Sequence, residues 1–448
     1  MKKHTQSPYE SSKVSYKPSG IEWLGEIPQS WEIRRLKHLT ILFTGESIKD
    51  ADKDKYSIVE NAIPYIATKD IGLDSNDVNY NNGMFIQNDD TGFKRAYKNS
   101  TLLCLEGANA GKKIAFLNQE VCFVNKLCCI SNKSKELDSK ALFYFFQGSF
   151  FKNTFFSNIS GLIGGVTTTQ LGNFKIPLPP LQEQKEIAEF LDSKCEKIQN
   201  YIDKKQKLIT LLQEKKQALI NEAATKGLNP NIESKNSDIE YLGLIPHHWE
   251  VVRSGLIYKN ISSGTTPQSD NDEYYKNGNI FWINSGDLND SVLTNSKNKI
   301  TQKAMMAHSA LKIFPKGSLI IAMYGATIGK VSILGIDACT NQACCVLCES
   351  KYLNTRFVFY YFVAKRQDLI SMAYGGGQPN ISQDIIKNFK IPLPPLQEQE
   401  EIAAFLDSKV AQIDSAIEKT KKQIELVKEY KNTLINEAVC GRINLERK

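Results

Sequence analysis

Two stretches of this chain, 215 residues apart, have almost the same sequence. Residues 173–194 are NFKIPLPPLQEQKEIAEFLDSK and residues 388–409 are NFKIPLPPLQEQEEIAAFLDSK, which agree at 20 of 22 positions. An internal repeat of this kind constrains the architecture before any single residue is considered. The chain is therefore a tandem duplication.

The repeat extends beyond these helix starts into the preceding sequence. The segment 24–28 with Trp31 recurs as 242–246 with Trp249, and the GxxxGK turn at 107–112 recurs at 325–330. Each copy is thus a globular stretch of roughly 155 residues followed by a helical stretch of about 45, which suits one domain and one arm.

The helical stretches carry a regular apolar seam. From Leu191 and from Leu406, steps of four and three residues meet an apolar side chain at eight of ten positions in each copy. A heptad seam of this length predicts a coiled coil, in which the two helices pair with each other. The alternative is that each helix packs on its own globular domain. The predicted seam includes Leu191, Ile198, Ile202, Ile209, Leu212 and Leu219, and Leu406, Val410, Ile413, Ile417, Ile424, Val427 and Leu434.

Composition indicates a soluble, cytoplasmic protein. The chain is 41% hydrophobic and 23% charged, and it has no apolar run near the roughly 20 residues of a membrane span. Most of the ten cysteines lie among Val, Phe, Leu and Ile, which is typical of buried strands in a reducing compartment. Cys345 and Cys348 form one CxxC, so a zinc site there is the alternative interpretation.

A net charge of +7 favours a polyanionic partner. Lysine, threonine, asparagine and glutamine gather between the expected strands and in a glycine-rich loop before each helix, where they could contact phosphates or base edges. The predicted DNA-binding residues are Thr68, Lys69, Lys94, Arg95, Gly161, Gly164, Gly165, Thr167 and Thr168 in the first copy, and Thr265, Thr266, Gln268, Lys303, Gly375, Gly376, Gln378 and Asn380 in the second.

No catalytic centre is evident. The two GxxxGK turns are one residue shorter than a phosphate-binding GxxxxGK[ST] loop, and Lys113 and Val331 stand where its hydroxyl would be. The five histidines show no spacing typical of a metal site or a catalytic triad. The sequence predicts neither a metal nor a cofactor bound to this chain.

Two variable globular domains, each opening with an IPxxW segment and closing with IPLPPLxEQ and a long helix, resemble the specificity subunit of type I DNA restriction-modification systems. The resemblance covers residues from about 20 to 441, and the duplicated PLPPLxEQ helix start is its most specific signal. The second domain also carries the Ser263–Pro267 loop and the Asn341-Gln342 pair. The first domain departs from that loop pattern, with Thr44-Gly45-Glu46-Ser47 instead.

The resemblance implies an α+β, pseudo-twofold protein in which two sheet-containing target-recognition domains are joined by two long helices forming an antiparallel coiled coil. The expected boundaries are a flexible N-terminal tail at 1–20, recognition domain 1 at 21–178, spacer helix 1 at 179–227, a linker at 228–238, recognition domain 2 at 239–393, spacer helix 2 at 394–441 and a C-terminal tail at 442–448.

Functionally, the resemblance implies a non-catalytic subunit that binds double-stranded DNA at a bipartite, asymmetric target. Two methyltransferase subunits and two restriction and translocation subunits would be its partners, and would hold S-adenosylmethionine, ATP and Mg. Two other classes remain open, a free-standing sequence-specific DNA-binding regulator with a coiled-coil spacer and a coiled-coil scaffold without a nucleic-acid role.

Overall fold

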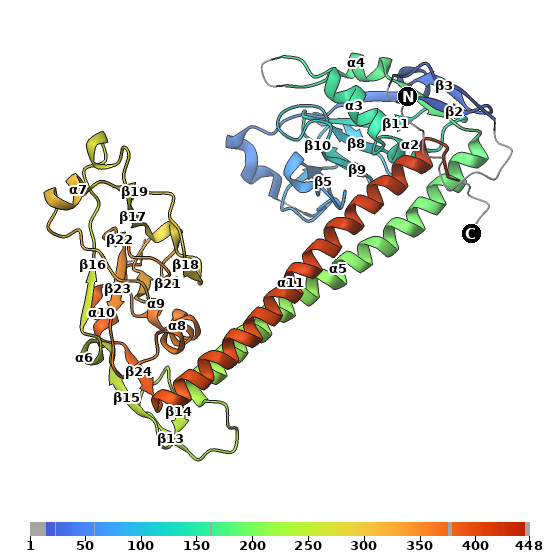
Figure 1. Ribbon diagram of the computed structural model, residues 1–448. Coiled ribbons are helices and arrows are strands. Elements are labelled where there is room, and N and C mark those ends of the chain that lie inside the picture. Colours follow the sequence, from blue (N-terminus) through green and yellow to red (C-terminus); the bar gives the residue numbers. More distant parts are fainter. Residues whose placement is uncertain (1–14, 23, 58, 162–163, 375–378, 444–448) are drawn as a thin grey trace, which may run out of the picture. The chain divides into compact units, whose positions relative to one another are not determined.

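The computed structural model describes residues 15–443 except 23, 58, 162–163 and 375–378. The chain divides into two compact units, residues 1–206 with 422–448, and residues 207–421. Each unit combines one globular repeat with part of α5 (Leu181–Lys226) and part of α11 (Leu396–Val439), the two long helices of Figure 1.

Two four-stranded sheets form the centre of the first unit. One has the order β4-β11-β8-β9 and is antiparallel, and the other has the order β6-β5-β10-β7 and contains the parallel pair β5–β10. The strands are β4 (Thr40–Thr44), β5 (Ala62–Ile66), β6 (Phe85–Gln87), β7 (Arg95–Ala96), β8 (Thr101–Cys104), β9 (Ile114–Phe116), β10 (Val121–Phe123) and β11 (Leu127–Asn132).

Short helices and two strand pairs complete the first unit. Its pairs are β1 (Tyr16–Pro18) with β2 (Glu26–Pro28), and β3 (Glu32–Arg35) with β12 (Lys175–Leu178). Its helices are α1 (Leu36–Leu39), η1 (Asp50–Ser57), η2 (Thr68–Asp70), α2 (Ser139–Phe145), α3 (Ser149–Ser157) and α4 (Thr168–Asn173).

The second unit repeats this plan. Its main sheet has the order β16-β23-β20-β21-β18, and the sheet β19-β17-β22 contains the parallel pair β17–β22. The strands are β13 (Ser234–Asn236), β14 (Leu244–Pro246), β15 (Glu250–Arg253), β16 (Asn260–Ser263), β17 (Ile280–Ile283), β18 (Val292–Leu293), β19 (Lys299–Ile300), β20 (Leu319–Ala322), β21 (Val331–Leu334), β22 (Cys339–Thr340), β23 (Cys344–Cys348) and β24 (Lys390–Leu393). The helices are α6 (Ser254–Ile257), η3 (Asp272–Tyr274), η4 (Ser285–Asp287), α7 (Gln302–Ala307), α8 (Thr355–Ala364), α9 (Arg366–Ser371) and α10 (Gln383–Asn388).

The strand before each proline pair fixes where the long helix begins. In the first unit β12 pairs with β3, which follows Trp31, and in the second β24 pairs with β15, which follows Trp249. Both tryptophans are fully buried in the core of their unit. Proline disrupts a helix interior and restricts the residue before it, so Pro179-Pro180 and Pro394-Pro395 keep each long helix from starting earlier.

The long helices run antiparallel within each unit. In the first unit the core joins Leu191, near the start of α5, to Ile435 and Ala438, near the end of α11. In the second unit it joins Ala223, near the end of α5, to Leu406, near the start of α11. The same cores contain residues of the globular repeats, so the helix ends pack both on each other and on a recognition domain.

Two short strands differ from the expected boundaries. Tyr16–Pro18 was expected in a flexible tail but forms β1, and Tyr16 Oη donates to the carbonyl oxygen of Gly441 at 3.1 Å. Ser234–Asn236 was expected in a linker but forms β13, which pairs with β14 as β1 pairs with β2. Each repeat therefore begins several residues earlier than predicted. Residues 1–14 and 444–448 lie outside the described residues.

Candidate nucleic-acid interface

Gly45 follows β4, and Gly264 follows β16. At each glycine the backbone passes close to a neighbouring strand, and this close contact fixes the loop. A Cβ atom on Gly45 would lie 1.8 Å from the Phe123 carbonyl oxygen, and one on Gly264 would lie 1.8 Å from that of Thr340. Any side chain at either position would displace a neighbouring strand. The first domain lacks the Thr-Pro of the second-domain loop but keeps its glycine for the same steric reason.

The GxxxGK turns need their glycines for backbone conformation. Gly107 and Gly111 have φ of 80° and 70°, and Gly325 and Gly329 have φ of 83° and 72°. The amide of Gly111 donates to the Cys104 carbonyl oxygen at 2.8 Å, which closes the turn between β8 and β9. These positive φ values explain the glycines without a bound phosphate.

Each glycine-rich loop packs against such a turn. In the first unit the Gly107 amide donates to Gly164 O at 3.0 Å, and the Val166 amide donates to Leu105 O at 3.1 Å. In the second the Ile381 amide donates to Met323 O at 2.8 Å, and Asn380 exchanges backbone hydrogen bonds with the exposed Tyr374. Gly161 is exposed. Gly375, Gly376 and Gln378 lie outside the described residues.

The first unit brings several predicted residues together beside its turn. Lys113 Nζ donates to Thr68 O at 2.8 Å, so η2 lies against the GxxxGK turn, and Lys69 is exposed next to it. Burial raises the pKa of Cys104, whereas the nearby Thr68, Lys113 and Lys126 lower it. The result is a lysine-bearing edge that includes two residues of the prediction.

Three other basic side chains of the predicted interface form ion pairs with carboxylates of their own domain. Lys94 Nζ lies 3.0 Å from Glu46 Oε1, Arg95 lies 3.5 Å from Glu120, and Lys303 Nζ lies 2.5 Å from Glu273. Their partial neutralisation makes them weaker candidates for phosphate contact than Lys69.

The predicted threonines have mixed environments. Thr167 is the N-cap of α4 and accepts a hydrogen bond from the Gln170 amide, which is a structural role. Thr168 begins that helix. Thr266 Oγ1 donates to Gln342 Oε1 at 2.6 Å, Thr265 O accepts from Trp282 Nε1, and Gln268 is exposed. Thr266 and Gln342 thus place one hydroxyl and one amide together on the second domain.

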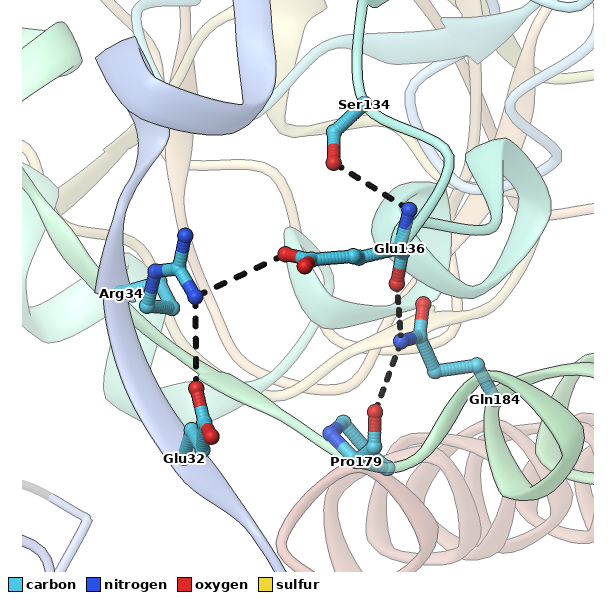
Figure 2. Close-up of polar contacts among 6 residues, drawn as sticks. All are labelled: Glu32, Arg34, Ser134, Glu136, Pro179 and Gln184. Atoms are coloured by element: carbon cyan, nitrogen blue, oxygen red, sulfur yellow. Dashed lines mark hydrogen bonds and ion pairs between the residues drawn. The ribbon is translucent and has the colours of Figure 1, made fainter.

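A buried glutamine joins each recognition domain to its helix. Gln184 is fully buried and donates to Pro179 O at 2.8 Å and to Glu136 O at 2.9 Å (Figure 2). Its side-chain oxygen accepts from the Asp138 amide at 2.8 Å. Gln399 repeats this arrangement with Pro394, Tyr352 and Asn354. Asp138 and Asn354 are the N-caps of α2 and α8, so the amide couples two helix starts.

Other contacts reinforce this joint. Arg34 in β3 lies 3.3 Å from Glu32 and 3.5 Å from Glu136, so that strand also holds the loop that Gln184 binds (Figure 2). Tyr144 Oη donates to Asp192 on α5 at 2.5 Å, and Tyr360 Oη donates to Asp407 on α11 at 2.6 Å. Sequence reasoning missed these roles. Their signal was the identity of the QEQ and FLDSK residues in both copies.

The predicted seam residues lie in the helix pair. Each is buried or half-buried, whereas the side chains between them are mostly exposed. Apolar residues outside the predicted seam, Ile187, Ile220, Ile402, Ile435 and Val439, are buried where the helices meet the globular repeats.

Nine of the ten cysteines are buried, and Cys195 is half-buried. Burial raises the pKa of the Cys122, Cys128 and Cys345 thiols to about 12, so they stay protonated at neutral pH. Among the described residues there is no group of three or more His, Cys, Asp or Glu side chains that could hold a metal ion. None of the described helices is both long and apolar enough to cross a membrane.

Comparison with known proteins identifies the family. Residues 28–211 and 246–426 match the type I restriction modification DNA specificity domain. The chain is 28% identical to the type I restriction enzyme MjaVIII specificity subunit of Methanocaldococcus jannaschii, over 94% of each chain.

Solved structures share the fold. One similar chain comes from a solved structure on complex assembly and conformational transition of the type I R-M system. It has a TM-score of 0.72 at 18% identity, and the match covers 93% of this chain and 99% of that one. The HsdS subunit from Thermoanaerobacter tengcongensis has a TM-score of 0.52 at 19% identity, over 93% and 98%. The chain belongs to the type I restriction-modification specificity family and carries two DNA specificity domains in tandem.

Proposed function

We propose that this chain is the DNA-recognition subunit of a type I restriction-modification complex and that each globular repeat recognises one half of a split target. The observation that carries the proposal is the match of both repeats to the DNA specificity domain. The two candidate interfaces differ in chemistry: the first presents Lys69 and Lys113, and the second presents Thr266 and Gln342. Different half-sites, and so an asymmetric target, follow from that difference.

The chain would act without chemistry of its own. Methyltransferase subunits would supply S-adenosylmethionine and adenine methylation, and restriction subunits would supply ATP- and Mg-dependent translocation and cleavage. We propose two of each per chain, because a duplicated chain offers each docking surface twice, and we expect them to meet DNA in the cytoplasm.

The outer faces of the long helices are the proposed docking surfaces. Leu211 on α5 and Leu426 on α11 occupy equivalent positions, 215 residues apart, and their exposed fractions are 51% and 55%. Large exposed leucines on a charged helix suit a protein partner. The exposed charged residues of these helices that are candidates for docking are Glu186, Lys194, Lys197, Lys204, Glu401, Lys409 and Lys422.

Selection of binding sites from a random duplex pool tests this function. The chain, assembled with its methyltransferase subunit, should enrich a motif of two unlike half-sites separated by an unspecified spacer. A Thr266→Ala, Gln268→Ala double variant should relax one half-site by about 1–3 kcal/mol for each base-contacting side chain that is removed, and leave the other unchanged. Enrichment of a single uninterrupted motif, or of none, would contradict the proposal.

A further inference from the structure

A cavity of about 460 Å³ lies in the first unit, where recognition domain 1 meets the long helices. Four lysines from three elements line it, together with one carboxylate, so the lining carries an excess of three positive charges. They are Lys112 of the GxxxGK turn, Lys152 of α3, and Lys428 and Lys431 of α11, with Asp74.

The single carboxylate already has an ion-pair partner. Asp74 Oδ2 lies 2.6 Å from Lys428 Nζ, which neutralises that lysine. No ion pair among the described residues includes Lys112, Lys152 or Lys431. Lys152 is half-buried, and burial alone lowers its pKa. Lys112 is exposed, and its ammonium group donates to the Ala108 carbonyl oxygen at 3.1 Å. A desolvated ammonium group that lacks a counter-charge, such as that of Lys152, favours the binding of an anion.

The duplication supplies an internal control for Lys431. Its equivalent 215 residues earlier is Lys216, which lies 2.7 Å from Asp414 Oδ1 in the second unit. The residue equivalent to Asp414 is Gln199, which lines the cavity and cannot supply a charge. One copy therefore neutralises this lysine internally, while the other leaves it charged and facing a cavity.

The GxxxGK turn shows a second difference between the copies. In the second unit Arg366 packs over Gly329, donates to its carbonyl oxygen and pairs with Asp290 at 2.5 Å. At the equivalent Gly111 the phenyl ring of Phe155 packs instead, and Gly111 borders the cavity. The surroundings of the GxxxGK turn therefore differ between the two copies.

We propose that this cavity, defined by Lys112, Lys152 and Lys431, binds a phosphate group of the DNA backbone. The inference rests on the proposed function. Lys112 stands next to Lys113, whose ammonium group bonds Thr68 in the predicted interface, so the cavity continues that interface. Ser75, Asn76 and Asn432 add neutral polar groups to the lining. A phosphate bound here strengthens DNA binding without reading sequence.

Lysine acetylation of the full-length chain, followed by mass spectrometry, tests the site directly. A duplex spanning both half-sites should reduce the reactivity of Lys152 and Lys431 several-fold and leave that of the exposed Lys175 unchanged. Inorganic pyrophosphate, used alone, serves as the second probe. Protection by pyrophosphate but not by the duplex would assign the cavity to a small phosphorylated molecule and overturn the DNA contact.

A salt titration of duplex binding provides an independent readout. The Lys152→Gln, Lys431→Gln double variant should lower the slope of log K against log salt by about 0.9 for each DNA phosphate that the cavity no longer neutralises. The control variant Lys175→Gln, Lys185→Gln changes two exposed lysines of the same unit outside the cavity and should leave the slope unchanged.

The outcomes separate this site from the proposed function. Suppose that the chain binds the duplex, that the duplex protects neither Lys152 nor Lys431 from acetylation, and that the salt slope of the Lys152→Gln, Lys431→Gln variant equals that of the wild type. This result would contradict the phosphate site but not the proposed function. If the wild-type complex binds no duplex, the proposed function is contradicted. Protection of Lys152 and Lys431 by pyrophosphate would then test only whether the cavity binds an anion.

Discussion

The indole nitrogen of Trp31 donates a hydrogen bond to Glu183 Oε1 at 2.9 Å, and Trp249 donates to Glu398 Oε2 at 3.1 Å in the second copy. Each bond joins the turn before β3 or β15 to the first turn of a long helix. The fully buried indole rings belong to the domain cores, and the glutamates belong to the repeated LQEQ sequence. The domain is therefore held to its helix by a polar contact at the edge of an apolar core.

Replacement of Glu183 should separate its hydrogen bond from its charge. Glu183→Gln keeps an acceptor for Trp31, whereas Glu183→Ala leaves the indole N–H unpaired and should cost about 1–3 kcal/mol. Burial raises the pKa of Glu183, and Glu186 raises it further, while the bond from Trp31 lowers it.

The raised pKa sets the sign of the pH dependence. The stability linked to Glu183 is fully present below the pKa of the unfolded chain, about 4.3, and is lost as the pH rises through the higher folded pKa. Relative to wild type, the Gln variant should therefore gain stability as the pH rises from about 4 to about 7, as measured by urea unfolding midpoints. Identical midpoints for the Ala and Gln variants at every pH would contradict a role for this bond.

We expect replacement of Gln184 to lower the stability of the folded protein more than replacement of most other polar residues. Gln184→Leu removes an acceptor from the Asp138 amide and a donor from two carbonyl oxygens, all at a buried joint. Unpaired buried groups of this kind cost about 1–3 kcal/mol each before relaxation. Thermal unfolding of Gln184→Leu should therefore occur well below that of Gln182→Leu, a matched change at an exposed position of the same turn. Equal melting temperatures would show that the amide does not join domain and helix.

Gly264→Ala should damage the second recognition domain. The added methyl group would lie 1.8 Å from the Thr340 carbonyl oxygen, so β22 or the Ser263–Pro267 loop must move. We expect a loss of about 2–4 kcal/mol and weaker binding to one half-site. Gly286→Ala is the control, because no atom lies within 4 Å of its added carbon. If both variants melt and bind alike, the close approach does not shape the loop.

The Lys216–Asp414 pair between the helices is suited to a double-mutant cycle. Its side chains are 31% and 48% exposed, so solvent screening limits the coupling energy to about 0.5–1 kcal/mol. Replacing both residues by leucine should leave the stability equal or higher, because leucine suits the seam and the desolvation of two charges is removed. A large loss in the double leucine variant would indicate that the pair specifies the helix alignment.

The sequence predicted the long helices well because their signals are local. The helices were expected at 179–227 and 394–441 and occur at Leu181–Lys226 and Leu396–Val439, since the prolines and the heptad pattern mark them directly. Strands β1 and β13 were not predicted because three-residue polar strands carry no alternation of apolar residues.

The candidate interface was harder to predict because its chemistry depends on partners distant in sequence. Lys94 and Arg95 were expected to contact DNA, but their carboxylate neighbours Glu46 and Glu120 come from other segments. Conversely, Lys152 and Lys431 were not selected, since only folding places α3 beside α11. Pairing across the fold decides which lysines keep their charge available.

Mapping N6-methyladenine across the genome tests the central claim most directly. A host expressing this chain with its methyltransferase subunit is compared with the same host lacking only this chain. We predict a split, asymmetric motif with an unspecified spacer that disappears when the chain is absent. Identical methylation maps from the two hosts, with the methyltransferase subunit present and soluble in both, would contradict the assignment of this chain as the subunit that selects the DNA target.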